Sequence, residues 1–468
     1  MPRRQITVVP DDDRTHRAIA ELRKDLEVPE SYPQAAIDSL ISDPPHPDHD
    51  LTDIPFETID PPGAMDLDQA IHLEKTDDGG YLFHYAIADV ARYIEPGSRL
   101  DEEAWERGAT LYGPVGRVPL HPASLVEGEA SLLPERTRVA NVWEIRLDGD
   151  AEPVDVSVRS ARVRSIRRRT YEEVQGFLDD GGETGFWPLV LELGRARREL
   201  EIARGGVSLP IPDQEVRAVD GGYGLIWDAP RPIDEANAQL SLLTGAVAAQ
   251  LMMDGGVGIL RTLPESTEEG MNQLRRVAKG LGIDWSGEET YGDLLQRLKP
   301  DVPEHLAMLT ESTMLFRGAG YQVVGDGAPH KHGALSMYYT HVTAPIRRLV
   351  DRYTGAICVA LSAGEEPPKW AVDALHRLPP VMADADRRAG QFERAGLDLV
   401  EALLLEDNVG ETFSAVVVES YDKGGEIMVR EPPIHANVNF KVELGETIDV
   451  ELSNVDVTRR TVSFRAAG

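Results

Sequence analysis

The sequence is nearly devoid of cysteine, with Cys358 as the one thiol in 468 residues. A single thiol excludes an intrachain disulfide framework and a cysteine-based zinc site. The chain also lacks an apolar run near the roughly 20 residues that a membrane span needs. No apolar stretch follows the N-terminal Met-Pro-Arg-Arg-Gln, as a secretory signal would require. We therefore expect a cytoplasmic protein with no membrane partner.

Basic residues are scarce as well, because 48 Lys and Arg stand against 80 Asp and Glu and give a net charge of −32. Nucleic-acid binders usually carry a basic footprint. The total therefore argues against such a partner unless the arginines are gathered in a channel. The length suggests about three domains of roughly 150 residues each, and a hydrophobic content of 41% is sufficient for ordinary cores.

The most informative stretch is residues 58–70, Thr-Ile-Asp-Pro-Pro-Gly-Ala-Met-Asp-Leu-Asp-Gln-Ala, which contains Asp60, Asp66 and Asp68. Its Pro and Gly residues disfavour a helix. Alternating runs at 69–74 and 81–88 predict that a β-hairpin follows. Three adjacent carboxylates repel one another unless a cation intervenes, and oxygen ligands suit Mg²⁺ or Mn²⁺. The alternative is a surface turn rich in Asp and Pro.

This stretch resembles the signature of the ribonuclease II/R family, the RNB nuclease domain, which reads Thr-Ile-Asp, five variable residues, then Asp-x-Asp-Asp-Ala. A second stretch, residues 339–351, reads Tyr-Thr-His-Val-Thr-Ala-Pro-Ile-Arg-Arg-Leu-Val-Asp. It is similar to the family's Tyr-Thr-His-Phe-Thr-Ser-Pro-Ile-Arg-Arg-Tyr-x-Asp. We expect a helix to begin at Pro345 with Thr343 as its cap, and helix N-termini favour phosphate.

The resemblance implies a metal-dependent hydrolytic exoribonuclease that degrades single-stranded RNA from 3′ to 5′ into nucleoside 5′-monophosphates, in RNA turnover or processing. It implies Mg²⁺ (or Mn²⁺) held by Asp60, Asp66 and Asp68, and catalytic roles for Asp66, Asp68 and Arg347. The implied RNA contacts are Tyr112, in the place of a tyrosine that stacks on bases, and Thr343, Arg347 and Arg348. We expect no organic cofactor. The sequence does not fix the oligomeric state, and a monomer is favoured.

Gln69 stands where the family carries a fourth active-site aspartate. A neutral amide attracts a metal less than a carboxylate does. We therefore expect weaker metal affinity, and we expect Gln69→Asp to lower the metal concentration that activity needs. The same residue motivates a competing hypothesis, an RNA-binding or regulatory protein on an inactivated nuclease scaffold. Retention of the three aspartates argues against that hypothesis.

The domain organisation that we predict is multidomain α+β. Residues 1–50 form a small helical unit, either a helix-turn-helix unit or an arm packed on the main domain. The first option would permit a third function, a DNA-directed factor. Residues 51–405 form the RNB-like nuclease domain of mixed sheet and helices, which ends in a long helix over 381–405. Residues 410–468 contain five short strands, typical of an OB-fold RNA-binding barrel. We expect these strands at 413–418, 426–430, 438–440, 447–452 and 461–464.

Two further features concern polar residues. Six arginines and no acidic residue lie between residues 159 and 169, interleaved with Val163 and Ile166. This pattern predicts a strand with one charged face that follows a phosphate backbone. The alternative is that the arginines pair with the surrounding acidic surface. The amides of Asn237 and Gln239 are expected on a buried helix, where they satisfy polar groups of the core.

Overall fold

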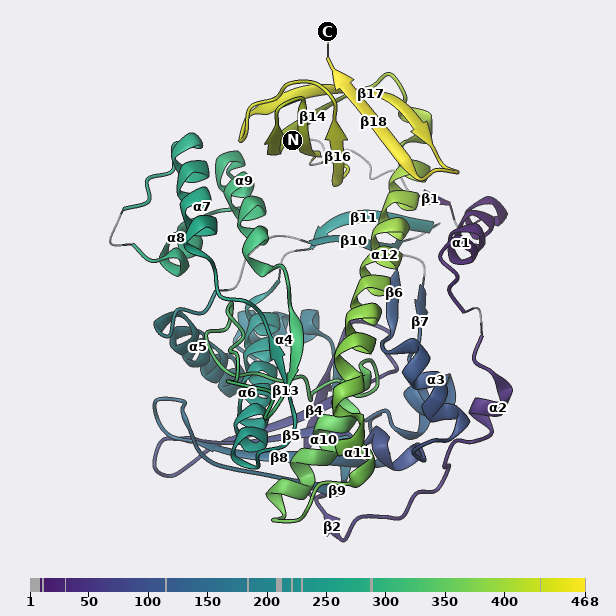
Figure 1. The fold of residues 1–468 in the computed structure, drawn as a ribbon, viewed down its shortest axis with the longest axis vertical. Coiled ribbons are helices and arrows are strands. Elements are labelled where there is room, and N and C mark those ends of the chain that lie inside the picture. Colours follow the sequence, from purple (N-terminus) through teal and green to yellow (C-terminus); the bar gives the residue numbers. More distant parts are fainter. Residues whose placement is uncertain are drawn as a thin grey trace.

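A computed structural model of the chain describes residues 9–467 except 11, 30, 114–115, 183–184, 208–212, 220–221, 229, 287–288 and 430. Arg430, the last residue of one predicted strand, lies outside the described residues. The fold is multidomain α+β, with a mixed sheet covered by helices and an antiparallel barrel at the C-terminal end (Figure 1). Within the described residues, no helix is long and apolar enough to cross a membrane.

The main sheet has six strands in the order β2-β9-β3-β4-β5-β8, and β9 also pairs with β8, so the pairings run in a closed ring. The predicted hairpin is confirmed as β4 and β5, in which Gln69 pairs with Ile87. Strand β9 is antiparallel to β8 and parallel to β3. The strands are β2 (His49–Asp50), β3 (Phe56–Ile59), β4 (Gln69–Lys75), β5 (Tyr81–Ala88), β8 (Thr137–Leu147) and β9 (Pro153–Arg169).

Side chains of the sheet alternate between two hydrophobic cores, as the two-residue period of a strand requires. Ile71 and Phe83 belong to the larger core, whereas Ala70 and Ala86 face the second one. The small alanines allow the segment around residues 125–132 to pack closely on that face. The helices that complete the larger core are α4 (Tyr171–Asp180), α5 (Trp187–Ala203), α6 (Pro232–Asp254), α10 (Leu349–Ser362), α11 (Lys369–Ala374) and the start of α12 (Leu378–Leu405).

Helix α12 connects the sheet to the barrel, and it runs through most of the height of the molecule in Figure 1. Met382 near its start packs in the core of the sheet, and Leu404 near its end packs in the core of the barrel. The barrel has the strand order β16-β15-β14-β17-β18, with β16 lying beside β18, and this matches the predicted OB fold. Its strands are β14 (Thr412–Tyr421), β15 (Gly424–Val429), β16 (Ile434–Val438), β17 (Thr447–Asp456) and β18 (Thr461–Ala466).

One barrel strand differs from the sequence-based expectation, which placed it at 438–440. It ends at Val438 instead, because Ile434, Ala436 and Val438 alternate into the barrel core.

The remaining elements surround this framework. Helices α7 (Glu268–Gly280), α8 (Tyr291–Arg297) and α9 (Pro303–Ser312) share a hydrophobic core of their own, and α9 lies against β14. Strand β1 (Val9–Pro10) pairs with the hairpin β10 (Asp213–Val219) and β11 (Gly222–Asp228), and β12 (Ile259–Thr262) pairs with β13 (Gly320–Val323). The short helices are η1 (Val90–Tyr93), η2 (Leu125–Glu129), η3 (Thr313–Phe316), η4 (Leu375–Arg377) and η5 (Glu406–Asn408).

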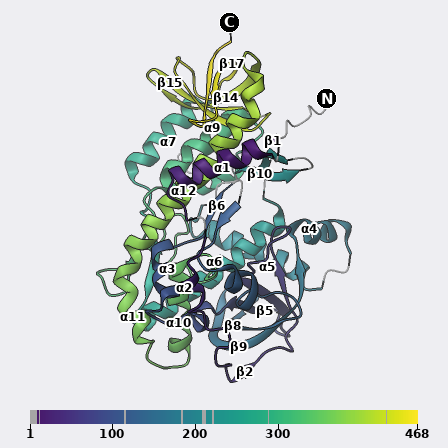
Figure 2. The same cartoon turned by 90° about the vertical axis from the view of Figure 1, so that its right-hand side faces the viewer.

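The N-terminal segment lies along the main body as an arm. Helix α1 (Asp13–Asp25) packs beside α12, close to the hairpin of β6 (Leu111–Gly113) and β7 (Gly116–Val118) (Figure 2). Helix α2 (Gln34–Ile37) is a single turn that lies against α3 (Arg99–Arg107). In a helix-turn-helix unit the second helix lies in the major groove of DNA. The single turn of α2 is too short for that role, so the N-terminal segment fits the alternative of an arm packed on the main domain.

Candidate active site

The first sequence motif forms the loop between β3 and β4, here called the aspartate loop (residues 60–68). Gly63 has a φ of +82°, a left-handed conformation that glycine adopts without strain. The far end of the loop is fixed by Ser131, whose hydroxyl accepts from the Leu67 amide at 3.0 Å and donates to the Met65 carbonyl at 2.6 Å. The backbone that carries Asp66 and Asp68 is therefore held in place without a metal ion.

The second motif meets this loop at Asp68. The amide of Ile346 donates to Asp68 Oδ1 at 2.8 Å, and Arg347 Nε lies 3.2 Å from Asp68 Oδ2. Asp68 is only 5% exposed, whereas the Arg347 side chain is 47% exposed. The fold thus places a buried carboxylate and an accessible guanidinium side by side, although Asp68 and Arg347 are 279 positions apart in the sequence.

The charge state of two aspartates is strongly perturbed. Burial raises the pKa of Asp60 to about 8, and the nearby charge of Asp68 adds to the shift. Burial also raises the pKa of Asp68 to about 7, while the charge of Arg347 opposes the shift. Burial raises a carboxyl pKa in this way when nearby positive charge and hydrogen bonds do not compensate for the lost hydration of the ionised form. The oxygen ligands of Asp60 and Asp68 therefore fit a hard divalent cation, which would favour their ionised forms.

Asp66 differs from the other two aspartates, because it forms an ion pair with Arg117 of β7. Arg117 also pairs with Glu127. Within the described residues, no three His, Cys, Asp or Glu side chains converge as a metal-binding group. The structure thus brings Asp60 and Asp68 close to each other, and it directs Asp66 to an arginine.

Gln69, the departure from the family signature, has both polar groups of its amide occupied. Its Nε2 donates to the Thr343 carbonyl at 2.7 Å, and its Oε1 accepts from the Tyr85 hydroxyl. The side chain therefore links the aspartate loop to the second motif in the place where the family carries an acid.

The predicted helix start at Pro345 is wrong. Helix α10 begins at Leu349, and residues 344–348 form a turn in which the amides of Arg347 and Arg348 donate to the Ala344 carbonyl. The physical reason is Asp351, whose Oδ1 accepts from the Ala344 amide at 2.7 Å. Thr343 does not cap the helix, and its hydroxyl shares a hydrogen bond with Ser241 at 2.9 Å.

Arg348 forms an ion pair with the same acid. Its guanidinium contacts Asp351 through two hydrogen bonds of 3.0 and 2.8 Å, and Asp351 is 1% exposed. The Asp351 carboxylate raises the pKa of Arg348, against the effect of burial. In this arrangement Arg348 holds the turn that presents Arg347, and its donors are directed toward Asp351.

Tyr112 lies on β6 at the edge of the site and is 46% exposed. Partial burial raises its pKa to about 12, and among its charged neighbours Arg347 lowers the pKa whereas Asp66 and Asp68 raise it. These neighbours are the residues of the two motifs. The structure therefore places an accessible aromatic ring beside the candidate catalytic groups.

Sequence analysis missed a wall of neutral polar groups at the inner side of the site. Tyr171 accepts a 3.0 Å hydrogen bond from Asn237, and the charge of Asp60 raises the pKa of Tyr171 in addition to the effect of burial. Asn237 and Ser241, four residues apart, lie on one side of α6. That helix was predicted to carry buried amides, and the prediction is confirmed.

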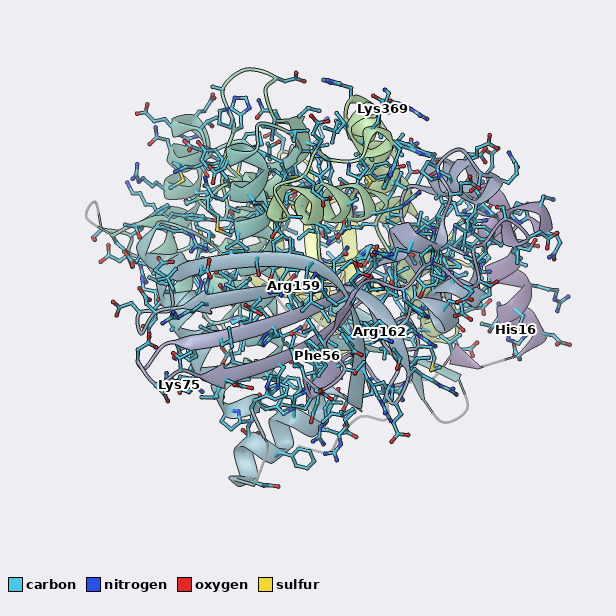
Figure 3. All side chains as sticks on the ribbon, turned by 90° about the horizontal axis from the view of Figure 1, so that it is seen from below. His16, Phe56, Lys75, Arg159, Arg162 and Lys369 are labelled. Atoms are coloured by element: carbon cyan, nitrogen blue, oxygen red, sulfur yellow. The ribbon has the colours of Figure 1, made fainter. Side chains whose placement is uncertain are left out.

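The arginine-rich segment is the end of β9, and the predicted strand is confirmed. One interpretation of its charge is a face that follows a phosphate backbone, and the other is pairing with the acidic surface. Each applies to some of the arginines. Ion pairs to Glu144, Asp50 and Glu57 hold three of the guanidinium groups, those of Arg159, Arg162 and Arg169. Figure 3 shows the first two of these arginines over the strands, seen from below. Among the described residues, Arg164 and Arg167 form no ion pair, and both are exposed.

Comparison with known proteins identifies the family. A model described as RNB domain matches residues 48–361, and one described as RNase II-type exonuclease C-terminal S1 domain matches residues 411–467. Ribonuclease R of Thermotoga maritima is 29% identical over 390 residues, which are 79% of this chain and 54% of that protein. The chain spans about half the length of the ribonuclease R relatives that it matches.

Solved structures share the fold at low identity. RNase R of Mycoplasma genitalium in complex with ribose methylated single-stranded RNA has a TM-score of 0.86 and 19% identity, and the match covers 98% of this chain and 79% of that one. Yeast Ssd1, a pseudonuclease, has a TM-score of 0.69 and 16% identity, covering 94% and 57%. The RNB match spans more than half of the sequence and includes both motifs that meet at Asp68. The chain therefore belongs to the family of RNB-domain proteins, with a C-terminal S1 domain of the RNase II type.

Proposed function

We propose that this protein is a metal-dependent hydrolytic exoribonuclease that removes nucleoside 5′-monophosphates from the 3′ end of single-stranded RNA. The observation that carries the proposal is the meeting of the two motifs, in which Asp68 lies against both the Ile346 amide and the Arg347 guanidinium. RNB-domain relatives named ribonuclease R support the reaction class.

The roles follow from the chemistry of the side chains. Asp60 and Asp68 would hold Mg²⁺ or Mn²⁺, and Asp66 would join them by exchanging its ion pair with Arg117 for the metal. Such an ion polarises a phosphoryl oxygen and lowers the pKa of bound water. Arg347 offers guanidinium donors to the charge that develops on the scissile phosphate. Tyr112 offers a ring face on which a base stacks, and this fixes the position of the phosphate relative to Asp68.

Two residues of the second motif take supporting roles in this proposal. Arg348 and Asp351 hold the turn, so that the Arg347 side chain is directed at Asp68. Thr343 joins α6 to the aspartate loop through its hydroxyl and its carbonyl. A contact from Arg348 to RNA would require it to leave a buried carboxylate unpaired, which is costly.

The competing function is an RNA-binding protein on an inactivated scaffold. The observation that favours it is Gln69, whose amide is occupied by Thr343 and Tyr85 and supplies no charge for a second metal ion. The pseudonuclease Ssd1 has a related fold. Against it stands the retention of Asp60 and Asp68 beside Arg347, because a protein that only binds RNA needs no metal-ligating carboxylates.

A 5′-labelled RNA of about 30 nucleotides distinguishes the two functions. We expect a metal-dependent ladder that shortens from the 3′ end, and its loss in Asp68→Asn. Asp150→Asn, a change of the same chemistry at an exposed turn, is the matched control and should leave the ladder unchanged. Intact RNA that is bound by the wild-type protein with either metal would reject the nuclease and support the binding protein.

A further inference from the structure

The hairpin that carries Tyr112 has little structure of its own. Strands β6 and β7 have three residues each and form a separate two-stranded sheet. An isolated two-stranded hairpin is marginally stable at best in water. The place of the Tyr112 ring therefore depends on what packs against the hairpin.

One face of the hairpin is clamped between two helices. Leu111 and Val118 are cross-strand partners, and both are buried in one cluster with Leu22 and Val28 of the N-terminal segment. Phe392 of α12 lies in the same cluster. Because side chains alternate along a strand, Tyr112 projects from the other face, toward the site.

The backbone of the hairpin approaches both helices closely. A Cβ on Gly113 would lie 2.5 Å from Cε1 of Phe392, so only glycine allows this approach. A Cβ on Gly116 would lie 3.1 Å from Nη2 of Arg23 on α1. The described part of the hairpin is therefore packed closely against Phe392 on one side and lies near the Arg23 side chain on the other.

Helix α1 is itself fixed at both ends to the C-terminal part of the chain. Arg14 forms a 2.5 Å ion pair with Glu406, just after α12, and Asp25 forms a 3.1 Å ion pair with Arg460. Arg460 lies in the turn between β17 and β18 of the barrel. Exposed ion pairs of this kind contribute little stability, so their effect is to fix the direction of α1. The buried side chain of Leu22 provides the main stabilising contact of the helix.

We infer that α1 is a positioning element: it packs the β6–β7 hairpin against α12 and thereby holds Tyr112 beside Asp66 and Arg347. The inference rests on the proposed function, because it assigns α1 to the binding of RNA by that site. Leu22 and Val28 are then positioning residues, which act on the RNA through the tyrosine. Figure 2 shows α1 crossing beside α12, directly above β6.

The test is a double-mutant cycle between Leu22→Ala and Tyr112→Ala, with KM and kcat measured on a single-stranded RNA. We expect Tyr112→Ala to raise KM roughly 5- to 100-fold, the range for one stacked base, and Leu22→Ala to raise it by part of that factor. The double variant should have the KM of Tyr112→Ala alone. The value of kcat at saturating RNA should be the same in the double variant as in Tyr112→Ala, since Leu22 acts on the RNA only through the tyrosine.

Controls separate positioning from general destabilisation. Leu274→Ala truncates an equally buried leucine in the α7–α9 core, and it should lower the melting temperature without raising KM. Leu22→Met, which keeps a side chain of similar volume, should have the KM of the wild-type protein and not the raised KM of Leu22→Ala. If Leu22→Ala does not fold, Val28→Ala makes a smaller truncation at the same contact and replaces it in the cycle.

Three results would overturn the inference. Multiplicative KM effects in the double variant would mean that α1 acts elsewhere, and an unchanged KM in Leu22→Ala would mean that it has no role in binding RNA. In both cases the wild-type protein still degrades RNA, so the proposed function survives. If the wild-type protein neither cuts nor binds RNA, the inference falls together with the proposed function. If the wild-type protein binds RNA without cutting it, the same double-mutant cycle is measured with the dissociation constant for RNA in place of KM.

Discussion

Replacing Gln69 by Glu changes the amide nitrogen of the side chain to oxygen. The change tests whether this side chain is a structural link between Thr343 and Tyr85 or a metal ligand. A glutamate still accepts from the Tyr85 hydroxyl but cannot donate to the Thr343 carbonyl, so two acceptors face each other at the 2.7 Å contact. Loss of the hydrogen bond and burial of an unpaired acceptor cost about 2–4 kcal/mol together. We therefore expect Gln69→Glu to lower the free energy of unfolding by that amount.

The assay combines thermal unfolding without metal and a metal titration of RNA cleavage. If Gln69 is a structural link, the melting temperature of Gln69→Glu should be several degrees below that of the wild-type protein. The Mg²⁺ concentration that half-saturates activity should not decrease. Gln273→Glu adds the same charge at an exposed position of α7 and should change neither quantity. An unchanged melting temperature together with a lower Mg²⁺ requirement would refute the reasoning, since the new carboxylate would then be acting as a metal ligand.

Three further predictions concern arginines and a buried histidine. Arg347→Ala should lower kcat by roughly 10²–10³, and Arg348→Ala should cost about 3–5 kcal/mol in urea unfolding, because it leaves Asp351 buried and unpaired; full activity in Arg347→Ala or unchanged stability in Arg348→Ala would contradict their assignment. Burial lowers the pKa of His121 to about 3 from 6.5, so the unfolded chain takes up a proton that the folded chain does not, and stability is lost as pH falls below 6.5, by about 2–3 kcal/mol at pH 4.5. His121→Met should remove this loss, and equal acid sensitivity of the two proteins would refute it. The pair Arg164→Ala/Arg167→Ala should reduce the slope of log affinity for long RNA against log salt by roughly 1.4, whereas Arg159→Ala, whose guanidinium pairs with Glu144, should leave it unchanged; an unaltered slope in the pair would exclude a phosphate-binding role.

The elements that the sequence predicted correctly depend on local signals. The alternation of apolar residues from Gln69 to Glu74 and from Tyr81 to Ala88 marks two strands, because side chains of a strand alternate between faces. Helix α3 likewise ends at a local signal, Gly108, which has a φ of +69°, as a glycine at a helix end commonly has.

The parts that could not be predicted depend on partners that are distant in sequence. Thr343 and Pro345 have the residue types of a helix start, but Asp351 holds the Ala344 amide and delays the helix to Leu349. The arginines of β9 read alike in the sequence, and the acids that pair with three of them lie on other strands or loops. The role of Gln69 required its partner Tyr85, which no spacing rule connects to it.

The central claim is that Asp68 and Arg347 form the centre of a site that hydrolyses RNA at its 3′ end. The most direct measurement is the identity of the first product released from a single-stranded RNA labelled at its 3′-terminal nucleotide, with and without Mg²⁺. We predict that the label leaves as a nucleoside 5′-monophosphate in the first turnover, only with metal, and not in Asp68→Asn. Release of a longer labelled fragment, or RNA that stays bound and intact in the presence of Mg²⁺ and Mn²⁺, would contradict the claim.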